Sequence, residues 1–187
     1  MNTNTSIRGN AFKKLHGQRG ASLLEGIAYL GIAAIVVLGA VSLLTGAFSS
    51  AQSNRVAEEV VSIRTGVKKL YMGQSSGYVA GSILPILIAA KVLPTTLTIT
   101  GAGTAATATN SWGGNVDVAG LAGGSSFSIT YGTVPQDACI NILSGASGWE
   151  SIVVAGGGTP PPLFPVSPAD AQTACGATGG TITWTSR

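Results

Sequence analysis

The sequence predicts an α+β protein, in which one long N-terminal helix carries a small head built on an antiparallel β-sheet. Three observations support this fold class. An apolar run over Ala21–Phe48 continues into a helix-periodic segment, five strand-like runs separated by turn-forming residues follow it, and short helical segments interrupt those strands. Of the 187 residues, about 110 remain for the head, which is enough for one small domain.

The apolar run begins after Arg19-Gly20 and contains a single charged residue, Glu25, in its 28 positions from Ala21 to Phe48. As a helix rising about 1.5 Å per residue it would be roughly 40 Å long, more than the ~30 Å hydrocarbon core of a bilayer. A charged side chain within a membrane span costs up to ~3 kcal/mol and usually marks a function. The run can therefore span a membrane, and Glu25 requires an explanation.

Beyond the apolar run, the helix is predicted to continue as an amphipathic segment to about Met72, where Gly73 ends it. Apolar residues recur there at steps of three and four, so one stripe is expected to pack on the head while the apolar half protrudes. Five glycines occur in the helix, which membrane helices tolerate. Alternatively, Ser42, Gly46 and Ser50, spaced by four, would let neighbouring helices approach closely. The apolar positions are Val56, Val60, Ile63, Val67 and Leu70, and the glycines are Gly26, Gly31, Gly39, Gly46 and Gly66.

The head is predicted to contain three short helices and five strands. Ser82 is expected to cap a helix over Ile83–Lys91. Pro135 opens a second helix, and the pair Ser167-Pro168 opens a third. The pattern does not determine the strand order. The predicted strands are Thr95–Thr100, Asn115–Ala119, Ser125–Tyr131, Ser151–Ala155 and Thr181–Thr185.

The two cysteines, Cys139 and Cys175, both fall in the head. Neither a second ligand pair nor a Cys-x-x-Cys spacing accompanies them, and a cysteine pair in an exported domain is more often a disulfide than a metal or redox site. A bond closing this loop of about 36 residues would constrain the unfolded chain by ~4 kcal/mol on the entropy model. It would also tie the proline-rich segment Thr159–Pro168 to the head.

Charge and side-chain chemistry argue against an enzyme or a nucleic-acid-binding protein. The formal charge of +3 comes from four basic residues in the first 20; beyond them, seven acidic residues face six basic ones. No basic stripe for phosphates remains, so no direct contact with nucleic acid is expected. His16, the single histidine, lies in the leader, and the acidic residues of the head are scattered, so no catalytic residue, cofactor or metal is expected. The leader's positive charge favours a cytoplasmic leader and an exported head.

Two simpler interpretations of the apolar run are weaker. A secretory signal has an apolar core of roughly 7–15 residues, shorter than this one, although Ser49-Ser50-Ala51 has the composition of a cleavage site. A plain signal anchor explains the span but leaves Glu25 without a role.

These residues resemble the type IV pilin family: a basic leader ending in Arg19-Gly20, a mature start at Ala21, Glu25 as the fifth mature residue, and an apolar helix beyond it. The resemblance implies that a prepilin peptidase cleaves after Gly20 and methylates the amine of Ala21. It also implies that inner-membrane assembly machinery moves the subunit into an extracellular filament. Ala21 replaces the phenylalanine of the best-known branch. With the 20-residue leader, this makes the chain most similar to type IVb prepilins, the subunits of toxin-coregulated, bundle-forming and thin conjugative pili.

The resulting prediction is a structural protein, the major subunit of a type IVb-like pilus that serves adhesion or conjugation. Residues 1–20 form the cleaved leader, 21–48 the membrane and filament-core helix, and 49–187 the outer helix (about 49–72) with the head. The protein is expected in the bacterial inner membrane with a periplasmic head, and then in a homo-oligomeric helical filament. There Glu25 would pair with the Ala21 ammonium of a neighbour, because a paired buried charge is tolerable and a lone one is not. In similar pilins a disulfide near the C-terminus frames an exposed region, where Cys139 and Cys175 fall.

Two other functions remain open. A minor pilin or a type II secretion pseudopilin would share the same helix, and copy number in sheared filaments separates these from a major subunit. A membrane-anchored binding module would use the head to recognise a sugar or a recipient cell. Trp112-Gly113-Gly114 is a candidate stacking surface for that role, although a structural turn with a packed tryptophan also explains it.

Overall fold

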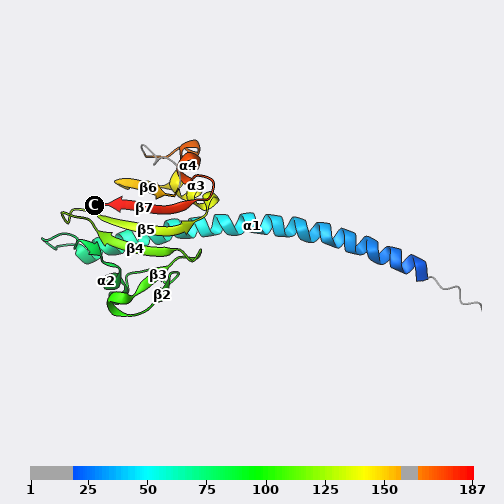
Figure 1. Ribbon diagram of the computed structural model, residues 1–187, viewed down its shortest axis with the longest axis horizontal. Helices are drawn as coiled ribbons and strands as arrows, with labels where there is room; N and C mark the ends of the chain where they lie inside the picture. The colour runs from blue at the N-terminus through cyan, green and yellow to red at the C-terminus, as the bar shows by residue number, and fades with distance from the viewer. Residues whose placement is uncertain (1–18, 157–163) are drawn as a thin grey trace, which may run out of the picture. The chain divides into compact units, whose positions relative to one another are not determined.

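The computed structural model describes residues 19–156 and 164–187, with side chains from residue 23 onward. Residues 1–18 of the predicted leader and part of the segment Thr159–Pro168 lie outside the described residues. The chain divides into two compact units, Met1–Leu44 and Thr45–Arg187. Helix α1 (Arg19–Tyr71) supplies residues to both units (Figure 1). The predicted long helix, which was expected to end at about Met72, is confirmed.

The apolar half of α1 exposes its side chains on every face. The large apolar side chains from Leu23 to Phe48 are between 52% and 80% exposed. Among the described residues, one helix, Leu23–Tyr71, is long and apolar enough to cross a membrane by length and composition. A helix that is apolar all round is stable only among lipids or other helices. The first unit therefore depends on surroundings that a single copy does not supply.

The outer half of α1 buries one stripe in the head. Val56, Val60, Ile63 and Val67 are at most 2% exposed, and Leu70 packs against the same core. The helix ends at Tyr71, and Gly73 follows with φ +90°, a conformation that glycine adopts without steric cost. The amphipathic pattern thus predicted the buried face correctly.

The head contains one seven-stranded sheet in the order β2-β3-β4-β5-β7-β6, with the short β1 paired to β4. Every pair of strands is antiparallel. Burial alternates along β4, β5 and β7, so one face of the sheet forms the core and the other meets solvent. The C-terminal strand β7 lies inside the sheet, between β5 and β6 (Figure 1). The strands are β1 (Gly81–Ser82), β2 (Thr98–Thr100), β3 (Thr107–Thr109), β4 (Asn115–Gly120), β5 (Phe127–Val134), β6 (Ser151–Ala155) and β7 (Gly180–Ser186).

Three short α-helices and one 3₁₀ turn complete the described part of the head. Helix α2 lies on one flank of the sheet, and α3 and α4 lie on the other (Figure 1). Helix α3 begins after Pro135, as predicted. Helix α4 begins after Ser167, whose Oγ accepts a hydrogen bond from the backbone N–H of Asp170 at 3.2 Å, as a capping serine does. The elements are α2 (Leu84–Ala89), η1 (Gly103–Ala105), α3 (Gln136–Gly145) and α4 (Pro168–Cys175).

The prediction that Ser82 caps α2 is wrong. Ser82 lies in β1, opposite Ala119 of β4, and its Oγ donates a hydrogen bond of 2.7 Å to Asp117 Oδ1. The residue at the N-cap is Ile83, which makes no side-chain capping bond. Strand pairing therefore fixes both the backbone and the hydroxyl of Ser82. Pairing with β4, which lies more than 30 residues further along the chain, thus prevents Ser82 from capping α2.

Gly66 differs from the other glycines of α1. A Cβ atom added at Gly66 would collide with the Cγ1 methyl of Val92, whereas nothing lies within 4 Å of a Cβ added at Gly26, Gly31, Gly39 or Gly46. The segment after α2 therefore packs directly on the backbone of α1. Gly66 therefore allows α1 to pack closely within its own head, whereas the other four glycines make no such contact in a single copy.

We expect Gly66→Ala to destabilise the head by about 1–3 kcal/mol, because overpacking at a close contact costs more than the helix propensity of alanine returns. Chemical denaturation of the detergent-solubilised chain, followed by tryptophan fluorescence, measures the change. Gly46→Ala is the matched control, since its added methyl group meets open space. Equal stability of the two variants would contradict the packing role of Gly66.

Candidate functional site

The predicted processing and assembly residues lie at the start of α1. Gly20 and Ala21 belong to the first turn of the helix, and the side chain of Glu25 is exposed one turn later. Among the described residues, the ion pairs of the structure do not include Glu25. The carboxylate is therefore placed where another molecule can reach it, and its pairing with an Ala21 ammonium stays a prediction.

A second acidic residue of α1, Glu59, is buried between the helix and the sheet. It is 6% exposed; Tyr131 Oη on β5 donates a hydrogen bond of 3.3 Å to its Oε2, and Arg55 Nε lies 3.7 Å from its Oε1. Burial raises the pKa of Tyr131, and the adjacent Glu59 carboxylate raises it further. The phenol therefore stays protonated and acts as the donor. This buried hydrogen bond connects α1 to β5.

Arg64 is a second polar anchor between α1 and the sheet. Its Nε donates to Ser186 Oγ at 2.9 Å, and its terminal nitrogen donates to the Gly148 carbonyl at 2.6 Å. The guanidinium also lies over the Trp149 ring, 4.7 Å from the ring centroid. These contacts tie the helix to the C-terminal strand and to the segment before β6.

A third anchor lies near the start of the second unit. Ser49 Oγ donates a hydrogen bond to Asp137 Oδ2 in the first turn of α3, and Ser53 Oγ donates to the Ser49 carbonyl at 2.9 Å. The bond from Ser49 lowers the pKa of Asp137, while partial burial opposes the shift. Glu59, Arg64 and Asp137 thus hold the outer half of α1 at three places along its length.

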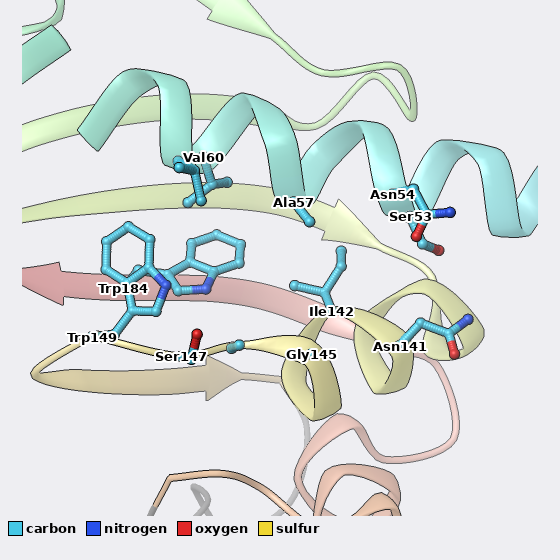
Figure 2. A pocket seen from close by; sticks show the side chains of 12 residues that line it. Ser53, Asn54, Ala57, Val60, Asn141, Ile142, Gly145, Ser147, Trp149 and Trp184 are labelled. Carbon is cyan, nitrogen blue, oxygen red and sulfur yellow. The ribbon is translucent and has the colours of Figure 1, made fainter. Parts of the chain in front are cut away.

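Between α1 and the C-terminal end of α3, the head contains a groove of about 310 Å³ (Figure 2). The α1 wall includes Ser53 and Ala57, the α3 wall includes Ile142 and Gly145, and Trp184 lies between them. The lining residues of this groove carry no charge, so they offer no acid or base for catalysis. The groove can accept an apolar surface. We refer to it as the α1–α3 groove.

The disulfide predicted between Cys139 and Cys175 is present. It joins the first turn of α3 to the last residue of α4, with Cα atoms 5.9 Å apart, and both cysteines are buried. The bond holds together the two helices on this flank of the sheet.

The segment Trp112-Gly113-Gly114 forms a structural turn. Asn110 Oδ1 accepts hydrogen bonds from the backbone N–H groups of Trp112 (3.0 Å) and Gly114 (2.9 Å), as in an Asx turn. Trp112 packs against the hydrophobic core and is partly buried. Within the described residues, no group of three or more His, Cys, Asp or Glu side chains is placed to hold a metal ion. The turn explains this tryptophan without a ligand.

Comparison with known proteins agrees with this architecture. The family model described as PilS N terminal matches residues 50–187. The crystal structure of a type IVb pilin from Salmonella typhi is similar, with a TM-score of 0.56 and 27% sequence identity, over 68% of this chain and 95% of that chain. No curated protein matches the chain. From the family match over more than half of its length and the shared fold, the chain belongs to the PilS family of type IVb pilins and is a pilin subunit.

Proposed function

We propose that this chain is the major subunit of a type IVb-like pilus. As a prepilin it is held in the inner membrane by residues 21–48, with a cytoplasmic leader and a periplasmic head. A prepilin peptidase cleaves it after Gly20 and methylates Ala21, and the assembly machinery then adds it to an extracellular filament. The observation that carries the proposal is the apolar half of α1, which exposes large apolar side chains on every face in a chain that belongs to a pilin family. Filament assembly surrounds this helix with copies of itself.

Glu25 is proposed to set the register of each incoming subunit. In the membrane its carboxylate is costly, and in the filament the ammonium of Ala21 from a neighbouring copy offsets that cost. Methylation leaves the positive charge of the amine in place, so pairing continues after processing. A subunit that is shifted along the filament leaves both charges unpaired and buried, which disfavours every other register.

Gly20→Val is expected to leave the leader attached, because a branched side chain then stands directly before the proposed cleavage site. N-terminal sequencing and intact mass of the membrane-bound protein measure this directly. Wild-type protein should start at a methylated Ala21. The control Gly31→Val, in open space on the same helix, should also start at Ala21.

The same measurement separates the proposed route from its alternatives. A wild-type start near Gln52 would indicate a cleaved secretory protein, and a start at Met1 would indicate an uncut anchor. Quantifying this chain in sheared surface filaments then tests the major-subunit role, because a major pilin must dominate the filament mass and a minor pilin or pseudopilin does not.

A further inference from the structure

The α1–α3 groove is open because small side chains line both of its walls. Ser53 and Ala57 belong to the α1 wall, and the opposite wall includes Gly145, the last residue of α3, and Ser147, which follows the helix (Figure 2). Trp184 is 1% exposed, so its ring serves as packing beneath the groove and not as a stacking platform for a sugar. The volume of the groove, about 310 Å³, corresponds to the liquid volume of roughly ten water molecules. The walls are mostly apolar, so displacing water from their apolar part with an apolar surface is favourable.

The surroundings of the groove point to a helix as its occupant. One wall is α1 itself, and Val61 on that wall is 53% exposed, which extends the apolar surface beyond the groove. Since no lining residue is charged, a charged peptide or a phosphate would lose its hydration without gaining a counter-charge. Small residues on the walls allow the close backbone approach that helix packing requires, as when an amphipathic helix enters a groove.

The chain itself supplies a matching surface. Of the 21 large apolar side chains that are exposed in the described residues, 14 lie between Leu23 and Phe48. From this complementarity we infer that the α1–α3 groove receives the apolar half of α1 from a second copy. The inference rests on the proposed filament. It adds that α3 of the head packs against the apolar helix of a neighbouring copy. Head residues, as well as the apolar helices, would then determine how neighbouring subunits fit together.

Photo-crosslinking in assembled filaments tests the occupant. The probe p-benzoylphenylalanine replaces Asn141, an exposed residue of the groove wall, and a control chain carries it at Gln172 on α4. The Asn141 probe should give crosslinked dimers whose peptides map to residues 23–48 of the second copy, and the Gln172 probe should not. Crosslinks from Asn141 to a head segment, or to another protein, would overturn the inference.

Filling the groove provides an independent test. Nothing lies within 4 Å of a Cβ added at Gly145, so Gly145→Phe should place its ring in the groove without disturbing the single copy. We expect roughly a tenfold loss of filaments or more. Overpacking weakens each contact between subunits by a free energy that corresponds to about a tenfold change in its equilibrium constant. Gln172→Phe, on an exposed face of α4, is the control and should assemble normally.

Failure of this inference can be distinguished from failure of the proposed function. Protease resistance and disulfide formation first show that the Gly145→Phe head has folded. Normal filaments from Gly145→Phe, together with no Asn141 crosslinks to residues 23–48, would overturn the groove and leave the pilus in place. Wild-type filaments in which this chain is a trace component would instead overturn the major-subunit role.

Discussion

Replacing Glu25 by alanine is expected to leave the protein processed and stable in the membrane while reducing filament yield by about a hundredfold or more. Removing one partner of a buried ion pair typically costs at least about 3 kcal/mol, because the other charge remains buried and unpaired. In the variant, each Ala21 ammonium would enter the filament core without a counter-charge. The single copy loses nothing, since Glu25 has an exposed side chain and belongs to none of the ion pairs in the described residues.

Filament mass after shearing, normalised to subunit in the membrane fraction, measures the effect of Glu25→Ala. Glu58→Ala is the matched control, because Glu58 is an exposed acid on the outer half of the same helix, and we expect near-normal yield. Glu25→Asp keeps the charge on a shorter side chain and should retain part of the assembly. Wild-type yield from Glu25→Ala would rule out charge pairing as the source of register.

The long helix and the main strands were predictable because their patterns are local. Apolar residues repeat along α1 with a helical period, and β2, β4, β5, β6 and β7 overlap strand-like runs that turn-forming residues delimit. The short strands β1 and β3 were missed, since two or three residues carry no periodic signal. Their strand conformation comes from pairing with β4, and β1 also explains why Ser82 does not cap a helix. Long-range pairing overrides local propensity at these positions.

The charged residues of α1 also differ in whether the sequence alone indicates a role for them. Glu25 stands out in the sequence as a lone charge in an apolar run. Glu59 and Arg64 do not, because their partners Tyr131 and Ser186 lie 72 and 122 residues away along the chain. One signal was available for Glu59, which falls on the same helical face as Val56, Val60 and Ile63. The α1–α3 groove left no signal, because it arises where small residues from separate segments meet across a fold whose strand order was not known.

The disulfide should account for the largest single contribution to the stability of the head. The double variant Cys139→Ala/Cys175→Ala is expected to lose about 4 kcal/mol of unfolding free energy, since the bond closes a loop with a sequence separation of 36 residues. The contacts of α4 are poor in large side chains: the residues that it buries are Ala171, Ala174 and Cys175 itself. Without the bond, little apolar area holds this helix on α3.

Because α4 precedes β7 in the chain, loss of the disulfide is also expected to affect the sheet. Strand β7 begins at Gly180, shortly after Cys175, and lies between β5 and β6, so freeing α4 also loosens the entry to an interior strand. Hydrogen exchange should therefore rise first in α4 and the start of β7, while the contact of α1 with β5 through Glu59 and Tyr131 stays protected. Denaturation of the double variant beside reduced wild-type protein measures the energy. A loss below about 1 kcal/mol would show that packing of α3 and α4 alone holds this flank.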